Sequence, residues 1–277
     1  MKTPATQQST YALGHLEQEL ERLSRQAEVF DPFTHQLLQQ AGISTGMRVL
    51  DVGCGAGDVA FLVADLVGST GGVVGVDRAA EAIQRATMRA QARHLENVKF
   101  LEGDPTKTQF DGPFDAVVGR LILMYYPDPI DAVRKLAGHV RDGGLVVFQE
   151  FDIANCRSLP PAPTFDRSVG WIKQALRATG ARTELGLEMY SLFLAAGLPG
   201  PSMRMDAAIG GGPDCPAFEM AAEVVRSLLP VMEKLQIATA TEVNIASLEQ
   251  RMRDEVVAAK GVALSPGLIG AWSRKPA

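Results

Sequence analysis

The chain has 277 residues, of which 46% are hydrophobic and 21% are charged, as in ordinary globular proteins and unlike disordered, collagen-like or disulfide-stapled chains. Its 27 basic and 32 acidic residues give a net charge of −5, which disfavours nucleic acid as a partner, and no run of about 18 apolar residues predicts a membrane span. Three isolated cysteines and a polar N-terminus without a signal-peptide core lead us to expect a cytoplasmic protein.

A helical leader is expected over residues 12–42. Apolar residues recur in it at spacings of three and four, which places them on one face of an amphipathic helix: Leu16, Leu20, Leu23, Ala27 and Phe30. Pro32 should end this helix, because proline lacks the amide hydrogen that an interior turn needs, and a second short helix should follow over residues 33–42. We therefore treat residues 1–45 as a helical N-terminal cap.

Residues 46–153 alternate between strand and helix patterns. Short apolar strands are expected at 48–52, 73–76, 98–101, 114–118 and 145–149. Helices are expected between them at about 57–68, 79–95 and 130–140, with a turn at Asp142–Gly144 before the last strand. Such regular alternation predicts a doubly wound α/β fold with a parallel sheet.

Residues 154–277 continue the same domain with a different texture. A proline-rich linker at 159–163 precedes helices near 165–178 and 186–196, and strands are expected at 202–209 and 267–274. These two strands would complete a seven-stranded, mostly parallel sheet. Between them lies a helical insert at about 213–262, which has the size of a lid over a substrate site.

A glycine-rich turn follows the first expected strand and opens the next helix. Gly53, Gly55 and Gly57 alternate there with small residues, and glycine lets backbone amides approach a ligand closely. This end of the first strand is where doubly wound sheets bind nucleotide-like ligands. The dinucleotide fingerprint G-x-G-x-x-G requires a glycine where this chain has Asp58.

Together with Asp51 in the preceding strand and acidic residues after the second and third strands, this turn resembles the motif set of class I S-adenosylmethionine (SAM)-dependent methyltransferases. The segments Phe114–Arg120 and Asp142–Gly144 are similar to further motifs of that family, in the expected order. The resemblance covers about residues 46–153 and is greatest to small-molecule enzymes of the ubiquinone/menaquinone-biosynthesis and natural-product types. It implies a Rossmann-like methyltransferase fold, with SAM as cofactor and S-adenosylhomocysteine (SAH) as product.

The resemblance also implies which residues hold the cofactor. Residues 51–57 would contact its methionine end, Asp77 both ribose hydroxyls, and Asp104 the adenine amino group. A carboxylate suits a vicinal diol because it accepts two hydrogen bonds at once. Taken alone, Asp77 and Asp104 are also typical of helix caps, and Arg120 of a surface ion pair. The full set expected at the cofactor is Gln26, Asp51, Gly53, Cys54, Gly55, Gly57, Asp77, Arg78, Gly103, Asp104, Pro105, Gly119 and Arg120.

The methyl-transfer site is expected where the fourth and fifth strands end. Tyr125 and Tyr126 follow the fourth strand, and their rings would favour a sulfonium by cation–π attraction. Glu150 ends the fifth strand, where a carboxylate would face the acceptor. By the resemblance, the leader folds over the cleft, which would make His15 a base. The alternative for the two tyrosines is packing under the following helix, and the alternative for Glu150 and His15 is a surface position without a catalytic role. The catalytic candidates are His15, Tyr125 and Glu150, and the acceptor-binding candidates are Tyr11, Tyr126 and Trp171.

These observations predict an enzyme that transfers the methyl group of SAM to a small, partly apolar organic acceptor, on carbon, nitrogen or oxygen. Attack in line on an already activated methyl group makes alignment the protein's main task. Two alternatives stay open: a protein that binds SAM without catalysis, and a nicotinamide-dependent oxidoreductase. No metal, nucleic acid or membrane partner is expected, and the apolar faces of the leader and the insert would allow a homodimer.

Overall fold

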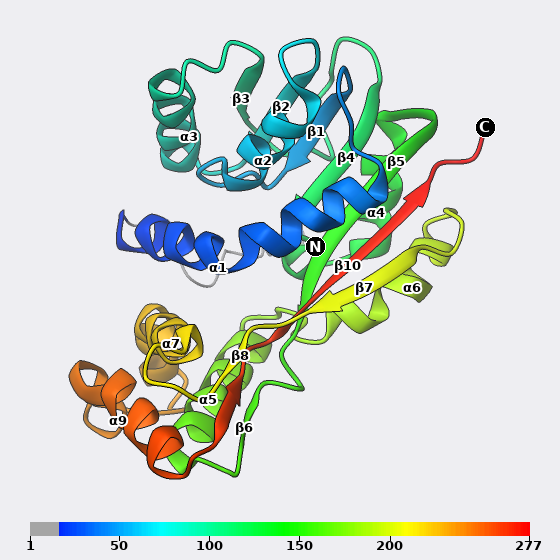
Figure 1. The fold of residues 1–277 in the computed structure, drawn as a ribbon. Coiled ribbons are helices and arrows are strands. Elements are labelled where there is room, and N and C mark those ends of the chain that lie inside the picture. The colour runs from blue at the N-terminus through cyan, green and yellow to red at the C-terminus, as the bar shows by residue number, and fades with distance from the viewer. Residues whose placement is uncertain (1–16) are drawn as a thin grey trace, which may run out of the picture.

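A seven-stranded sheet forms the centre of the computed structural model, which describes residues 17–277, with side chains from Ala27 onward (Figure 1). Its strand order is β3 (Val98–Glu102), β2 (Gly72–Asp77), β1 (Arg48–Val52), β4 (Phe114–Arg120), β5 (Val140–Asp152), β10 (Gly267–Arg274) and β7 (Ser202–Asp206). The first five strands in that order pair in parallel, whereas β10 runs antiparallel to both of its neighbours. The predicted doubly wound, mostly parallel sheet is therefore confirmed.

Helices cover both faces of the sheet: α1 (Glu17–Ala41), α2 (Asp58–Val67), α3 (Ala80–Ala92), α4 (Pro129–Gly138) and α6 (Leu185–Ala195). On one face, α1 and α2 share an apolar cluster with β1 and β5. On the other face, α4 and α6 pack against Leu50, Val117 and Phe148 of the same sheet. The central strands are apolar on both sides because both sides are covered.

The leader helix differs from its prediction at Pro32. α1 runs unbroken from Glu17 to Ala41 with Pro32 inside it, so the expected break and second short helix are wrong. Phe30, Leu37 and Leu38 are almost fully buried on either side of the proline. Packing of this apolar face outweighs the missing hydrogen bond, because most helix stability in proteins comes from tertiary contacts.

The predicted turn at Asp142–Gly144 lies inside β5 instead of before it. The pairing of β4 with β5 is irregular there, with Phe114 opposite Val140 but Ala116 opposite Leu145. The extra residues bulge out of the ladder and leave the rest of the strand in register with β4.

A small second sheet in residues 154–277 was missed by the sequence analysis. β6 (Arg157–Leu159), β9 (Val262–Leu264) and β8 (Ile209–Gly210) pair antiparallel in it. The strand predicted at 202–209 therefore divides between two sheets. Strands this short carry little periodicity, and only their pairing partners far along the chain define them.

The predicted helical insert is present as α7 (Pro216–Lys234), α8 (Ala240–Val243) and α9 (Ile245–Ala258). It packs against α5 (Pro163–Ala178), which lies earlier in the chain. α7 packs against both α5 and α9. Glu255 of α9 accepts hydrogen bonds from the amide (2.7 Å) and the hydroxyl of Thr164, in the first turn of α5. Figure 1 shows this helical group at the opposite end of the molecule from α3, with α1 lying between them.

Candidate functional site

A cavity of about 860 Å³ lies where the carboxyl ends of β1, β2 and β4 meet α1, α5 and α7. Its volume is in the upper part of the range of about 300–1,000 Å³ that is usual for ligand pockets. One end is lined by the glycine turn and by charged side chains that follow the strands, among them Asp77, Asp104 and Arg120. The other end is apolar and is lined from α5 and α7. We call these the cofactor end and the acceptor end, after the ligands that the sequence leads us to expect there.

The glycine turn forms the floor of the cofactor end. Gly53 and Gly55 have φ angles of +67° and +53°, a left-handed conformation that favours glycine. A Cβ on Gly53 would lie 2.5 Å from the Ile122 side chain, so a larger residue would displace the loop after β4. A Cβ on Gly55 would meet none of the described atoms within 4 Å, and Gly55 lines the cavity. Its backbone is therefore open to a ligand.

Asp77 fastens this turn to the end of β2. One carboxylate oxygen accepts a hydrogen bond from the Gly55 amide at 2.9 Å, and the other accepts one from the Ala79 amide at 2.9 Å. Each carboxylate oxygen retains a further lone pair. Since Asp77 lines the cavity, those lone pairs can accept hydrogen bonds from two neighbouring hydroxyl groups of a ligand.

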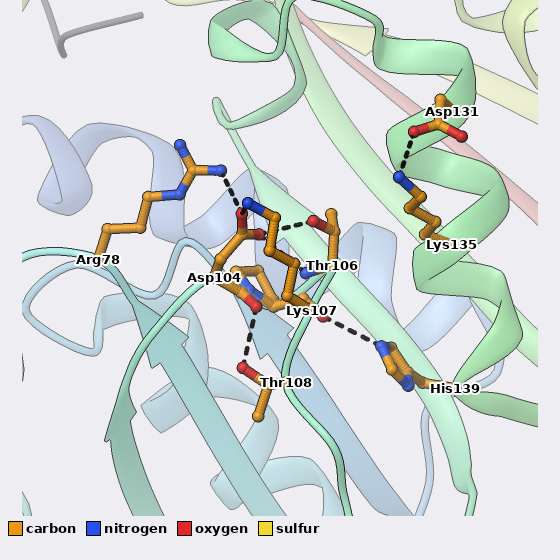
Figure 2. A network of polar contacts seen from close by, with 9 residues as sticks. Arg78, Asp104, Thr106, Lys107, Thr108, Asp131, Lys135 and His139 are labelled. Atoms are coloured by element: carbon orange, nitrogen blue, oxygen red, sulfur yellow. Dashed lines mark hydrogen bonds and ion pairs between the residues drawn. The ribbon is translucent and has the colours of Figure 1, made fainter. Parts of the chain in front are cut away.

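Asp104 is the centre of a polar network beyond β3 (Figure 2). Its Oδ1 accepts hydrogen bonds from the amide (3.0 Å) and hydroxyl (2.7 Å) of Thr106, and its Oδ2 pairs with Arg78 (2.9 Å) and Lys107 (3.5 Å). Partial burial alone would raise the pKa of Asp104, but the hydrogen bonds from Thr106 and the two nearby cations outweigh it and lower the pKa. Asp104 is thus an ionised acceptor at neutral pH.

Arg78 lines the cavity beside this network. Its guanidinium carbon lies 5.5 Å from the centroid of the Tyr126 ring, while its Nη2 pairs with Asp104. Burial raises the pKa of Tyr126 to about 12, so its hydroxyl stays protonated. An amino group that binds Asp104 from the cavity competes with Arg78 for the same carboxylate.

Arg120 joins β4 to the leader helix. Its Nη1 donates hydrogen bonds to Asp31 Oδ1 and Thr34 Oγ1 of α1, both at 2.9 Å, and the side chain also lines the cavity. Asp51 lies behind the glycine turn, and its Oδ2 is buried without a hydrogen-bond partner among the described residues. Burial raises the pKa of Asp51 to about 8, against the charge of Arg120. Asp51, Gly57 and Gly119 do not line the cavity and support the residues that do.

Of the expected catalytic and acceptor residues, Tyr125 and Tyr126 line the cavity. Glu150 does not: it is fully buried, and its Oε1 accepts hydrogen bonds from the Ile122 amide (2.9 Å) and the Leu123 amide (2.6 Å). The structure therefore does not place Glu150 against an acceptor, as the sequence analysis expected. The cause is the alternation of β5, which turns this side chain towards the loop after β4.

Trp171 is also not among the lining residues. It packs partly buried against the core, while Val169, Ile172 and Leu176 of the same helix line the cavity. These three positions share one face of α5, and Trp171 is off that face. The spacing of apolar residues in this helix was a signal from which the lining residues could have been found. Tyr11 and His15, and the side chain of Gln26, lie outside the described residues.

The apolar wall of the acceptor end comes from segments far apart in the chain. Its side chains include Phe30 of α1, Phe151 of β5, Ile153 directly after that strand, and Met220 and Val224 of α7. Phe30 and Phe151 meet edge to face, with ring centroids 5.3 Å apart.

Within residues 27–277, no cluster of His, Cys, Asp and Glu has the arrangement of a metal site. None of the helices in the described part of the chain is long and apolar enough to span a membrane.

A family profile described as a methyltransferase domain matches residues 43–182, a little over half of the chain. The chain belongs to this methyltransferase domain family. The matched region contains the glycine turn, Asp77, Asp104 and the loop after β4, so the resemblance inferred from the motifs is confirmed.

Two curated relatives and one solved structure illustrate what the chain is similar to. The aklanonic acid methyltransferase DauC of Streptomyces sp. (strain C5) is 34% identical over 137 residues, which are 48% of this chain and 62% of DauC. The demethylmenaquinone methyltransferase of Staphylococcus aureus (strain MRSA252) is 32% identical over 131 residues, which are 47% of this chain and 51% of that enzyme. The chain therefore spans less than two thirds of either relative. The cyclase SpnF shares the fold, with a TM-score of 0.51, 21% identity, and coverage of 89% of this chain and 81% of SpnF.

Proposed function

We propose that this protein transfers the methyl group of SAM to a small, largely apolar organic acceptor. The observation that carries the proposal is one cavity with two unlike ends, a charged end built from the family's cofactor motifs and an apolar end beside it. The names of the two curated relatives, both methyltransferases of small organic molecules, support the same class of reaction.

The residues at the cofactor end fit SAM. Asp77 offers a carboxylate to a ribose diol, and Arg120 lines the cavity with a guanidinium group that can donate to a carboxylate. The Oδ2 atom of Asp51, buried behind the turn without a hydrogen-bond partner among the described residues, is an orphaned polar atom of the kind found at functional sites. When bound, SAM supplies a methyl group on a sulfonium, which a nucleophile displaces in line. The protein's part is to hold the acceptor, exclude water and keep the two ligands aligned.

Asp58 argues against a nicotinamide cofactor. It stands at the start of α2, lines the cavity and pairs with Arg89 at 2.8 Å. In a dinucleotide site, the pyrophosphate would occupy this helix N-terminus. A carboxylate there repels that group, whereas the cationic sulfonium of SAM tolerates it.

The second candidate function is SAM binding without methyl transfer. The fold neighbour SpnF is named a cyclase, which illustrates that this fold by itself does not fix the reaction. The two candidates share the cofactor end and differ only in what happens in the acceptor end.

Calorimetry with SAH, with NADH as the comparison ligand, tests the proposal. We expect SAH to bind and NADH not to bind. Asp77→Ala should weaken SAH about 100-fold, because two hydrogen bonds to a charged group contribute about 3 kcal/mol together. Asp131→Asn is the matched control, since this carboxylate pairs with Lys135 on α4. Binding of NADH instead of SAH would overturn the proposal.

Methyl transfer is then measured with labelled SAM and a panel of apolar phenols, enols and amines. Labelled product supports the enzyme. SAH binding without labelled product from any compound of the panel would favour the second candidate.

A further inference from the structure

The segment Leu121–Tyr126, which we call the β4 loop, forms part of the cavity wall. It begins in a costly conformation, because Leu121 has a φ of +56°, a value that side chains with a Cβ disfavour. The Leu121 amide still donates a hydrogen bond to the Gln149 carbonyl oxygen at 2.8 Å, which extends the pairing of β4 with β5 to the first residue of the loop. All residues of the loop except Leu123 line the cavity. An unfavourable backbone conformation of this kind persists only where the surrounding structure holds it in place.

Glu150 supplies that contact from the neighbouring strand. Its Oε1 accepts hydrogen bonds from two successive amides, Ile122 (2.9 Å) and Leu123 (2.6 Å). Leu123 starts the single 3₁₀ turn η1 (Leu123–Tyr125), whose first amides have no partner within the turn. One carboxyl oxygen thus caps the turn that carries Tyr125 into the cavity.

The surroundings of Glu150 give no other reason for a carboxyl group. It is fully buried, and its Oε2 has no hydrogen-bond partner among the described residues. α6 lies directly on the strand, since a Cβ on Gly186 would come within 2.8 Å of the Glu150 carbonyl oxygen. Burial raises the pKa of Glu150 to about 8, opposed by the backbone amides of the β4 loop and by no charged side chain. An apolar side chain would be cheaper to bury here if the loop did not need an acceptor.

The position of the β4 loop matters to both ends of the cavity. Ile122 is wedged against the glycine turn, where a Cβ on Gly53 would lie 2.5 Å from its Cδ1 atom. Met124 and Tyr125 line the cavity further along the loop. A shift of the Ile122 and Leu123 amides therefore moves the cofactor turn and the wall beside the acceptor together.

We infer that Glu150 is a positioning residue for methyl transfer: its buried carboxyl group fixes the β4 loop so that the cofactor and the acceptor meet at the required distance and angle. The effect of Glu150 on methyl transfer rests on the proposed function, whereas its hydrogen bonds to the β4 loop do not depend on that function. Glu150 touches neither ligand site itself and acts through Ile122, Leu123 and Tyr125.

Hydrogen exchange on the full chain without ligands tests the hold on the loop. Glu150→Ala removes the acceptor and should speed exchange of the Ile122 and Leu123 amides about tenfold or more, as local opening becomes easier. Glu150→Gln keeps an oxygen at the same place and should stay within about threefold of the wild type. Glu150→Asp keeps the carboxyl group but shortens its reach, and it carries the same test if Glu150→Ala does not fold. If the Ile122 and Leu123 amides exchange at the wild-type rate in Glu150→Ala or, where that variant does not fold, in Glu150→Asp, the inference is overturned.

Asp152→Asn is the matched control for these variants. Asp152 is a fully buried carboxyl on the same strand, but it accepts hydrogen bonds from the Ala154 amide (3.0 Å) and the Asn155 side chain instead of the β4 loop. Its substitution should leave exchange at residues 121–126 unchanged. Faster exchange there in Asp152→Asn would show a general loosening of β5 and would overturn the inference.

Kinetics separate positioning from direct proton transfer. Glu150→Ala should lower kcat about 10- to 100-fold with a smaller change in KM, because misplacement by about 1 Å costs this much in aligned reactions. Glu150→Gln should restore most of kcat. Equal loss in both variants would make Glu150 a proton-transfer group and overturn the inference. Failure of the wild type to bind SAH would overturn the proposed function alone, because the exchange result needs no cofactor.

Discussion

The two ends of the cavity are built in different ways. The cofactor end consists of short segments that each follow a strand, and hydrogen bonds with defined partners hold them, such as those of Asp77 to Gly55 and Ala79. The acceptor end consists of single apolar side chains from α1, β5, α5 and α7, held by packing. The first depends on backbone conformation at individual positions, and the second depends on volume and shape. Changes at one end should therefore leave the other end working.

The largest effect is expected at the cofactor end, from Gly55→Val. A β-branched residue is strained at the φ of +53°, and its side chain would enter the space open to the ligand. SAH affinity, measured by calorimetry, should fall about 100-fold or more. The neutral fluorescent probe N-phenyl-1-naphthylamine should still bind at the acceptor end.

Gly138→Val is the matched control for that prediction. Gly138 also has no described neighbour within 4 Å of an added Cβ, but it belongs to α4 and does not line the cavity. Its effect on SAH affinity should stay within about twofold, as for an ordinary surface substitution. An equal loss of SAH affinity in both variants would contradict the role of the glycine turn.

A smaller loss of affinity, at the acceptor end instead of the cofactor end, is expected from Ala221→Phe. Ala221 of α7 lines the cavity, and a phenyl ring would fill space that an apolar ligand needs. Affinity for N-phenyl-1-naphthylamine should fall about tenfold, or about 1.4 kcal/mol, while SAH affinity stays unchanged. Ala221→Ser, of similar size, should leave both affinities near the wild-type values. A parallel loss of SAH affinity in Ala221→Phe would show that the two ends are not separable.

The smallest effect is expected at Glu150, which acts on both ends of the cavity through the β4 loop. Its pKa of about 8 in the folded chain exceeds the ordinary value of 4.5, so the folded chain keeps a proton that the unfolded chain releases. This stabilisation is fully present below the unfolded pKa and is lost as the pH rises towards 8. The free energy of unfolding should therefore decrease with rising pH, by up to about 1.4 kcal/mol per unit from this group.

Glu150→Gln has no such proton, so its free energy of unfolding should depend less steeply on pH. Urea unfolding of both proteins between about pH 5 and 7 measures the difference in slope. Asp51, whose pKa is raised in the same direction, contributes equally to both proteins and cancels. Identical slopes would show that Glu150 is ionised in the folded chain throughout this range.

Most of the residues that line the cofactor end could be predicted because each belongs to a short motif at the end of a strand. Gly53, Gly55, Asp77, Asp104 and Arg120 were all expected at the cofactor from motifs that end a strand, and all of them line the cavity. The acceptor end was not predictable in this way. Its wall combines Phe30 with residues of α7 nearly two hundred positions later, and no local pattern connects them.

The sequence by itself determined the alternation of strands and helices, the sheet, the glycine turn and the family, because periodicity and short motifs are local properties. Only the tertiary structure decided that α1 continues through Pro32, that three short segments pair into a second sheet, and that Glu150 faces a loop instead of a ligand. Each of these outcomes depends on a partner distant in the chain, whose burial or hydrogen bonds outweigh the local preference.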